Sequence, residues 1–313
     1  MLAPGRGLRR ASLRDIANQN GPGDFAVAAR LNDVHLGSGT TADYPERRKT
    51  RINEAAVPTN ELAEWLSILW LTPAMDRLFT EGASGRRNFL DRLGTALEPA
   101  HAGNCARYDA ARRERNRLLA DVRPTDHGWM DSLENQLARY GSLVAEARNR
   151  MVTALNERLQ QSDRTIFATP ELQLADGQLL AEDQLLQMLK QYKAADRAAG
   201  RTTRGPHRTD LAVFHAAKQQ PAAKCSTGEQ KALLFSIILA HADLIADRRE
   251  NRPILLLDEV AAHLDPERRG ALFDKLAERG GQVWLTGTEP SLFADIPDDA
   301  LHFEVSDGRV RLR

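Results

Sequence analysis

The fold is decided by the stretch Cys225-Ser226-Thr227-Gly228-Glu229-Gln230-Lys231 and by the residues just after it. An apolar, helix-like run comes next, and then come Pro253-Ile254-Leu255-Leu256-Leu257-Asp258-Glu259 and Ala262-His263-Leu264-Asp265. The four residues from Ile254 to Leu257 form a short, continuous apolar run. Such a run is typical of a strand that is buried on both faces, as in a parallel sheet. We therefore expect an α/β fold.

Two carboxylates, Asp258 and Glu259, stand where this strand would end. Ligands of open α/β sheets bind beyond the carboxyl ends of the strands. Mg²⁺ prefers one or two carboxylates together with phosphate oxygens and water. Asp258 can therefore hold the metal ion, and Glu259 can polarise an attacking water molecule. The alternative is a solvated strand end, because adjacent acidic residues are common.

The earlier stretch has the features of a helix N-terminus. Ser226 and Thr227 are good N-caps, and Glu229 and Gln230 would lie in the first turn. Gly228 lets another backbone or a phosphate group approach closely. The free N–H groups and the partial positive charge of a helix N-terminus suit phosphate. Taken alone, an ordinary capped helix is the better interpretation, but the order of capped helix, apolar helix, acidic strand end and following aspartate favours a phosphate site.

This order of motifs resembles the ABC-type ATPase heads of the SMC-like DNA-repair proteins, and among them the RecF family of bacterial recombination mediators. Ser226 to Gln230 matches the ABC signature, and Asp258 and Glu259 match Walker B and its catalytic acid. The D-loop is matched by His263-Leu264-Asp265. Other fragments that resemble RecF are Pro4-Gly5-Arg6-Gly7-Leu8-Arg9, Arg86-Arg87-Asn88-Phe89-Leu90-Asp91 and Gly205-Pro206-His207-Arg208-Thr209-Asp210-Leu211. The resemblance extends nearly from end to end.

The resemblance implies an ATPase head that works as an ATP-dependent homodimer, with ATP and Mg²⁺ as cofactors. In such dimers the signature of one subunit caps the nucleotide held by the other. The residues expected to contact the nucleotide are Ser226, Thr227, Gly228, Glu229, Gln230 and Asp265. Asp258 is expected to bind Mg²⁺, and Glu259 is the expected catalytic residue. The resemblance also implies binding to double-stranded or gapped DNA, loading of recombinase with RecR and RecO-type mediators, and support of replication restart and the SOS response.

The sequence departs from the family in one respect, because it contains no G-x-x-x-x-G-K-[ST] motif. The glycine-rich stretch Gly37-Ser38-Gly39-Thr40-Thr41 has no lysine and is interpreted as a turn between two strands. In the family the phosphate loop lies ahead of the segment that begins here at Pro4, so we expect the first strand and this loop to be missing before Met1. Without the loop the β- and γ-phosphates lose most of their ligands. We therefore expect weak or absent ATP binding by residues 1–313 alone.

The composition is that of an ordinary soluble globular protein, with 42% hydrophobic and 27% charged residues. A chain of 313 residues can hold one large domain or two ordinary ones with ample core. Because the formal net charge is +0, any site for DNA must be a local patch. Cys105 and Cys225 are far apart, which argues against zinc and disulfides. With no transmembrane-length run and no signal sequence, we expect a cytoplasmic protein with no membrane partner.

We expect the ATPase head to be built from residues 1–100 and 206–313, with a helical lobe inserted at 101–205. A helix at 106–122 and a second one form an antiparallel hairpin in this lobe. The second helix is indicated by an apolar stripe with steps of four and three, formed by Leu133, Leu137, Tyr140, Val144, Ala147, Met151 and Leu155. Later, a strand at 282–286 leads to Thr286 and Thr288, at the usual place of the ABC switch residue. A final hairpin turns at Asp307-Gly308.

Two basic clusters are candidates for contacts with the DNA backbone. The first cluster, on a probable loop, is Arg47, Arg48 and Lys49, and the second, on the first helix of the hairpin, is Arg112, Arg113 and Arg115. For each cluster the alternative is a solvated surface.

Two other functions stay open. One is a truncated, ATPase-inactive fragment that binds DNA or a protein partner, and salt-sensitive DNA binding unaffected by ATP would favour it. The other is a different ATPase of the same superfamily, such as an OLD-type nuclease. That class should carry an additional acidic metal-binding domain, for which this chain has no room.

Overall fold

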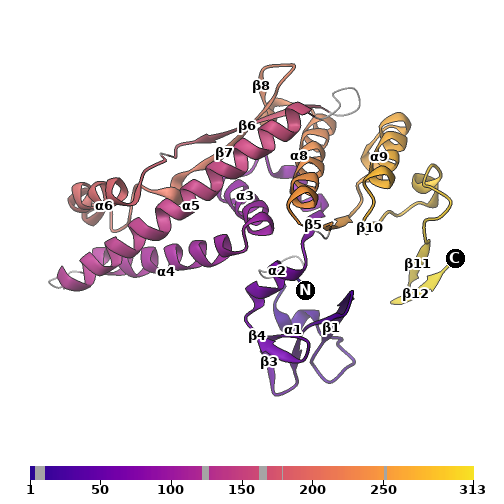
Figure 1. The fold of residues 1–313 in the computed structure, drawn as a ribbon, viewed down its shortest axis with the longest axis horizontal. Coiled ribbons are helices and arrows are strands. Elements are labelled where there is room, and N and C mark those ends of the chain that lie inside the picture. Colours follow the sequence, from indigo (N-terminus) through magenta and orange to yellow (C-terminus); the bar gives the residue numbers. More distant parts are fainter. Residues whose placement is uncertain (4–10, 122–126, 162–167, 178, 250–251) are drawn as a thin grey trace.

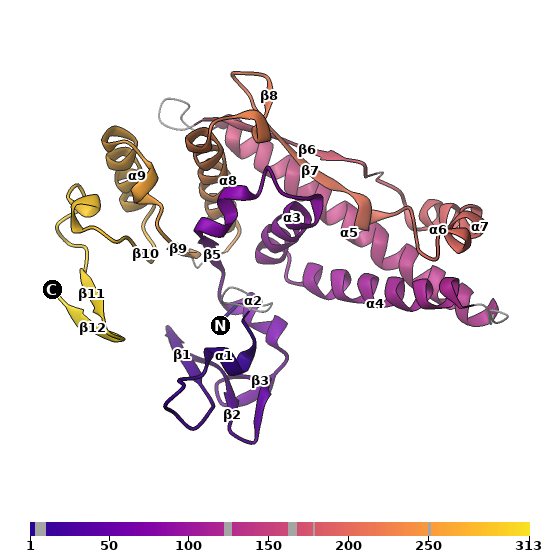
Figure 2. The ribbon, with the colours of Figure 1, turned by 180° about the vertical axis from the view of Figure 1, so that it is seen from behind.

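The computed structural model describes residues 1–3, 11–121, 127–161, 168–177, 179–249 and 252–313 (Figure 1). The segment from Pro4 to Arg9 lies outside these residues. An antiparallel sheet at the N-terminus, a long helical lobe and a central group of strands and helices extend in different directions (Figures 1 and 2). The central group joins the other two.

The central group contains a three-stranded parallel sheet, as the apolar run predicts. The strand order is β10–β9–β5, with β5 at Ile68–Leu71, β9 at Ile254–Leu257 and β10 at Val283–Leu285. Leu255 and Leu257 share one buried core with helices α8 (Thr227–Arg248) and α9 (Pro266–Arg279). The prediction that both faces of β9 are buried is wrong. Leu256 and Trp284 lie on the other face and are 39% and 47% exposed, because the described helices cover only the first face.

The N-terminal sheet is antiparallel, with the order β1–β2–β3–β4. Its strands are β1 at Ala26–Leu31, β2 at Val34–Thr41, β3 at Tyr44–Ile52 and β4 at Ala55–Val57. Two predictions are corrected here, since residues 37–41 belong to β2 instead of a turn and residues 46–51 belong to β3 instead of a loop. Gly39 is therefore required by strand pairing and not by a turn. A Cβ atom on Gly39 would lie 2.2 Å from the carbonyl oxygen of Phe25, so only glycine allows the two strands to approach here.

The helical lobe consists of α4 (Ala100–Ala120), the first part of α5 (His127–Gln161), α6 (Glu182–Gln191) and α7 (Lys193–Ala198). Helix α3 (Ala83–Leu97) and an antiparallel sheet with the order β6–β7–β8 share their core with α8 and β9. The strands of this sheet span Pro170–Ala175, Asp210–His215 and Gln220–Pro221. The predicted hairpin is confirmed by α4 and α5, and six of its seven stripe residues are buried. Tyr192 is the C-cap of α6 and the N-cap of α7, so the two helices are separated by a break at this residue.

Helix α5 connects the two cores of the molecule. Its 35 residues span about 52 Å, from one end of the lobe to the central group (Figure 1). Leu133 and Leu137 near its start pack in the core of the lobe, whereas Met151 and Leu155 pack in the core that contains α8 and β9. One continuous helix therefore fixes the position of the lobe relative to the parallel sheet.

The remaining elements are short. Helices α1 and α2 span Leu13–Ile16 and Leu62–Trp65. The predicted C-terminal hairpin is confirmed by β11 (Phe303–Ser306) and β12 (Arg309–Leu312). Among the described residues, the longest apolar stretches inside helices fall short of what a membrane span requires.

Candidate nucleotide and metal site

The two predicted carboxylates lie at the carboxyl ends of the parallel strands. Asp258 follows β9 directly, and its N–H donates to the carbonyl oxygen of Leu71 at the end of β5 at 2.9 Å. Thr286 follows β10, and its hydroxyl donates to Oδ1 of Asp258 at 2.7 Å. Three adjacent strands therefore position one carboxylate. Among the described residues only one of its two oxygens has a partner, so the other is available to a cation.

Glu259 adopts an unusual backbone conformation in this site. Its φ of +54° lies in the left-handed region, which is uncommon for a residue other than glycine. The N–H of Glu259 donates to Oγ1 of Thr286 at 3.2 Å. Thr286 thus contacts both acidic residues, since its hydroxyl donates to one and accepts from the other. Strained backbone of this kind is found preferentially at functional sites.

A small cavity of about 10 Å³ borders the two carboxylates. It has room for roughly one water molecule. Lys231, from the second turn of α8, and Asp76 also line it, and the Lys231 ammonium lies 2.8 Å from a carboxylate oxygen of Asp76. The lysine side chain is only 14% exposed, so this ion pair is largely shielded from solvent.

The helix that begins after Ser226 is capped as the sequence predicts. Oε2 of Glu229 accepts from the N–H and the hydroxyl of Ser226, both at 2.9 Å, and the Ser226 hydroxyl accepts from the Glu229 N–H at 3.4 Å. Glu229 also forms an ion pair with Lys218. This ion pair, followed by the contacts with Ser226, lowers the pKa of Glu229 to about 2. The glutamate therefore stays ionised and holds the first turn in place.

The other residues of the predicted signature differ in their surroundings. Thr227 is exposed, and a Cβ atom added to Gly228 would meet nothing within 4 Å. Gln230 differs from the prediction, because it is 7% exposed and its amide donates inward to the Cys225 carbonyl at 2.9 Å. Asp265 is the N-cap of α9, where Oδ1 accepts from the N–H of Arg268 at 2.9 Å. The structure therefore shows exposed Ser226, Thr227 and Asp265 and a buried Gln230.

Three residues of the site were missed or assigned differently from sequence. The sequence indicates Thr286 only as a candidate switch residue, and it indicates no ligand role for Asp76 or Lys231. The sequence carries a partial signal for Thr286, because it follows a second apolar strand and the carboxyl ends of parallel strands share one edge of a sheet. That this strand lies next to β9 is known only from the structure. The pairing of Lys231 with Asp76 joins segments 155 positions apart and has no local signal.

The six predicted DNA contacts fall into two groups. Arg47, Lys49 and Arg113 are exposed and Arg112 is half-buried beside Asp109, so these four stay predictions. The prediction for Arg115 is wrong, because its side chain is 0% exposed and paired with two carboxylates.

Arg48 also differs from the prediction of a DNA contact. It is half-buried, and its guanidinium donates to Oγ of Ser38 at 2.7 Å and to the carbonyl oxygen of Ala3 at 3.0 Å. Its side chain therefore holds the N-terminal residues against β2 instead of facing solvent.

Comparison with known proteins places these features in a family. No family model matches the sequence. The chain is similar to the DNA replication and repair protein RecF of Brucella abortus, with 46% identity over an alignment of 324 positions that covers 99% of this chain and 84% of the relative. The RecF protein of Rhizobium johnstonii is 45% identical over an alignment of 325 positions, which covers 99% and 87% of the two chains.

A solved structure shares the fold. The recombination mediator protein RecF of the RecFOR pathway, in a structure named for its complex with ATP, superimposes with a TM-score of 0.82. It is 20% identical, and the match covers 97% of this chain and 84% of that one.

Proposed function

The chain belongs to the RecF family of DNA replication and repair proteins, and we propose that it binds DNA in recombinational repair through an ATP-dependent head. The observation that carries the head assignment is the arrangement of Asp258 and Glu259 at the ends of three parallel strands, with Thr286 bonded to both. This is where the ligands of open α/β sheets bind. The high identity across nearly the whole chain supports the role in repair.

In this proposal the two carboxylates have different tasks. Asp258 holds Mg²⁺ through its carboxylate, a donor type that this ion prefers. Thr286 fixes the orientation of that carboxylate, as hydrogen-bonding neighbours do for metal ligands. Glu259 orients the attacking water, and the hydrogen bond that its backbone N–H donates to Oγ1 of Thr286 fixes the backbone at this residue. When bound, the ion neutralises charge on the phosphates of ATP.

We assign the nucleotide contacts of the signature to a homodimer that forms with ATP. Ser226, Thr227, Gly228 and Glu229 lie at the N-terminus of a 22-residue helix, where backbone N–H groups and the helix dipole favour phosphate. Asp265 belongs to the same interface. Gln230 stabilises the first turn of α8 through the hydrogen bond that its side-chain amide donates to the Cys225 carbonyl.

For the partners we propose double-stranded or gapped DNA and the RecR and RecO-type mediators, with recombinase loading and the SOS response as the context. Arg47, Lys49, Arg112 and Arg113 are the proposed contacts with the DNA backbone. We also propose that the protein acts in the cytoplasm.

A second candidate is a module that binds DNA or a protein partner without ATPase activity. It is favoured by one observation, since the 313 residues contain no G-x-x-x-x-G-K-[ST] motif. Without the lysine and the backbone cradle, the β- and γ-phosphates lose most of their ligands. We therefore predict weak binding of Mg-ATP by residues 1–313 alone, and a submillimolar affinity in calorimetry would contradict this.

One experiment separates the two candidates. The anisotropy of a fluorescent gapped duplex is measured against protein concentration, over a series of salt concentrations, with and without Mg-ATP. Salt-sensitive binding that strengthens with Mg-ATP supports the ATP-dependent head, whereas salt-sensitive binding that ignores Mg-ATP supports the second candidate. No salt-sensitive binding under either condition would rule out the ATP-dependent DNA-binding head and would leave the second candidate only as a module for a protein partner.

A further inference from the structure

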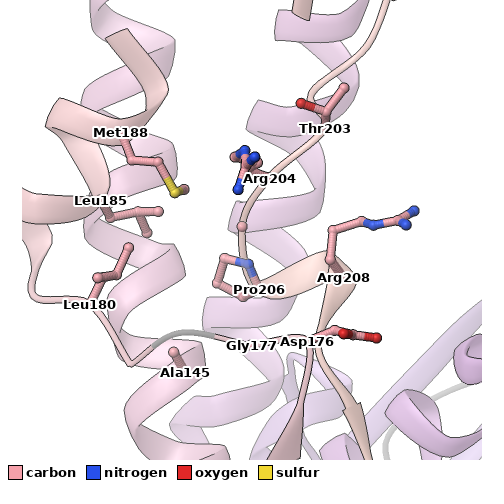
Figure 3. Close-up of a pocket in the computed structure, with 11 residues that line it drawn as sticks. Ala145, Asp176, Gly177, Leu180, Leu185, Met188, Thr203, Arg204, Pro206 and Arg208 are labelled. Atoms are coloured by element: carbon pink, nitrogen blue, oxygen red, sulfur yellow. The ribbon is translucent and has the colours of Figure 1, made fainter. Parts of the chain in front are cut away.

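The helical lobe contains a cavity of about 570 Å³ that the proposed function does not use (Figure 3). It lies between α5, α6 and the loop at 203–208. Leu180, Leu185 and Met188 give it an apolar wall, and Arg204 and Arg208 lie on the opposite side, where the loop passes (Figure 3). The volume falls within the range that is typical of ligand-binding pockets.

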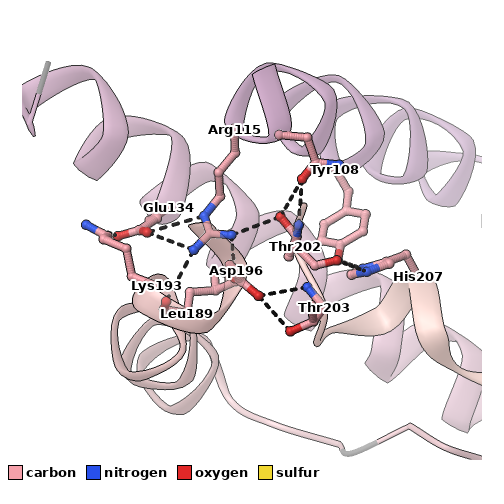
Figure 4. Close-up of polar contacts among 10 residues, drawn as sticks. Tyr108, Arg115, Glu134, Leu189, Lys193, Asp196, Thr202, Thr203 and His207 are labelled. Atoms are coloured by element: carbon pink, nitrogen blue, oxygen red, sulfur yellow. Dashed lines mark hydrogen bonds and ion pairs between the residues drawn. The ribbon is translucent and has the colours of Figure 1, made fainter. Parts of the chain in front are cut away.

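The loop that carries the two arginines is fixed from behind by buried polar groups. Thr203 donates to Oδ1 of Asp196 through its N–H at 2.9 Å and through its hydroxyl at 2.6 Å. The guanidinium of Arg148 donates to the Pro206 carbonyl at 2.6 Å. His207 is joined to the Tyr108 hydroxyl by a hydrogen bond of 2.7 Å (Figure 4).

The anchor of the loop is itself part of a buried ion network (Figure 4). Arg115 bridges Asp196 and Glu134, at 2.7 Å and 3.0 Å, and none of the three side chains is more than 2% exposed. Arg115 also donates to the Thr202 hydroxyl at 2.9 Å. The loop, which ends in the short 3-10 helix Pro206–Arg208, is thus held in one conformation, as a binding loop on a rigid scaffold would be.

Arg204 and Arg208 are free to bind an anion. Both are exposed, and neither forms an ion pair with any described residue. Arg204 is held in position by the ring of Tyr192, since its guanidinium carbon lies 4.1 Å from the ring centroid. An oriented but unpaired guanidinium is suited to bind a carboxylate through two parallel hydrogen bonds.

We propose that this cavity binds a short segment of a protein partner, in which an acidic residue stands next to a large apolar one. The apolar side chain packs against Leu180, Leu185 and Met188, and the carboxylate is bound by Arg204 and Arg208. A methionine in the wall suits a peptide, because its flexible side chain adapts to different shapes.

The chemistry of the cavity favours a peptide over nucleic acid. The carboxylate of Asp176 also lines the cavity, where it can accept a hydrogen bond from a peptide N–H, a donor that the phosphate backbone of DNA lacks. The apolar wall likewise has no counterpart on a phosphate backbone. This inference concerns a surface other than the nucleotide site, so it stands or fails independently of the proposed ATP dependence.

The test is a selection from a random peptide library displayed on phage, with the full chain as target and the R204E/R208E variant for counter-selection. We expect the recovered peptides to carry an acidic residue beside leucine, phenylalanine or methionine. Synthetic copies should bind the unaltered chain at least tenfold more tightly than R204E/R208E. The matched control is R197E/R201E, which makes the same charge change at exposed positions of the lobe that do not line the cavity, and it should bind like the unaltered chain.

Other results would overturn the proposal. They are the recovery of no peptide, the recovery of peptides without acidic residues, and equal loss of binding in the control. The Met188→Glu variant tests the apolar half, and peptide binding that it leaves unchanged would exclude the assigned wall. If R204E/R208E loses binding to a fluorescent DNA duplex while no peptide is recovered, the cavity is a nucleic-acid contact instead. Thermal unfolding of each variant shows that the lobe remains folded.

Discussion

Arg115→Met should lower the free energy of unfolding by several kcal/mol, because it removes a cation from between two buried carboxylates. The side chains of Arg115 and Glu134 are 0% exposed, and that of Asp196 is 2% exposed. Removing one partner of a buried ion pair typically costs about 3–5 kcal/mol, since it leaves an uncompensated charge. Methionine keeps most of the buried volume, so the loss would report charge and hydrogen bonding more than a cavity.

The remaining contacts of the two carboxylates place the effect near the lower end of that range. The Lys193 ammonium lies 3.0 Å from Oε2 of Glu134, and Thr203 donates twice to Asp196. These contacts survive the substitution, so neither carboxylate loses every partner. We therefore expect a loss of about 3 kcal/mol, which is roughly a hundredfold change in the unfolding equilibrium.

The assay is urea unfolding of the full chain, followed by circular dichroism. The control is Arg113→Met, two positions away on the same helix but exposed, for which the expected change is below about 0.5 kcal/mol. If Arg115→Met unfolds within about 0.5 kcal/mol of this control, the network does not stabilise the lobe. The rigidity assigned to the loop at 203–208 would then also lose its basis. In the expected case, amide exchange at Thr203 should become faster in the same variant.

Three further predictions concern the site and the loop. Thr286→Val should weaken the binding of Mn²⁺, used as a probe for Mg²⁺, about tenfold, because Asp258 loses its orienting hydrogen-bond donor. The assay is a titration followed by electron paramagnetic resonance, and the control Thr288→Val should bind Mn²⁺ like the unaltered chain. Gly205→Ala should lower the free energy of unfolding in urea by about 1–3 kcal/mol, because φ of Gly205 is +130° and the new Cβ atom would lie 2.8 Å from the Tyr108 hydroxyl. An unchanged urea midpoint of unfolding would contradict this. Burial, and then the charge of a neighbouring arginine, lowers the pKa of His207 to about 4. The unfolded imidazole takes up a proton below about pH 6.5 and the folded one only near pH 4, so stability should fall by at most about 3 kcal/mol as the pH drops through this window. His207→Gln should flatten that decline in urea unfolding, and an equally steep decline would count against the assignment.

The helix from Thr227 to Arg248 and the strand at 254–257 could be predicted from sequence because their signals are local. A capping serine with a glutamate three positions later marks a helix start, and four apolar residues before two acids mark a buried strand. Strands β2 and β3 were missed because glycines and charges suggest turns locally, whereas pairing with neighbouring strands decides the outcome. The closeness of Gly39 to the Phe25 carbonyl is a tertiary fact with no signal in the sequence.

The same limit applies to individual side chains. Arg115 lies in a row of arginines, and only the positions of Glu134 and Asp196, on other helices, distinguish it from its exposed neighbour Arg113. The contact between Thr286 and Asp258 depends on β10 lying next to β9, and the sequence does not state the order of strands. The acidic character of the strand ends could thus be predicted from sequence. The residues that pair with these acids could be identified only from the strand order in the structure.

Gly228 supports the idea that the signature acts on something outside its own chain. Glycine in a helix costs up to about 1 kcal/mol relative to alanine, and such a cost usually has a local reason, such as positive φ or crowding. Neither reason applies here, since a Cβ atom would meet nothing within 4 Å and the residue lies in the regular first turn of α8. Gly205 and Gly39 differ in this respect, because each is required by neighbouring atoms of the same chain. An approaching nucleotide or partner backbone, which needs the space that a methyl group would occupy, gives Gly228 a physical reason.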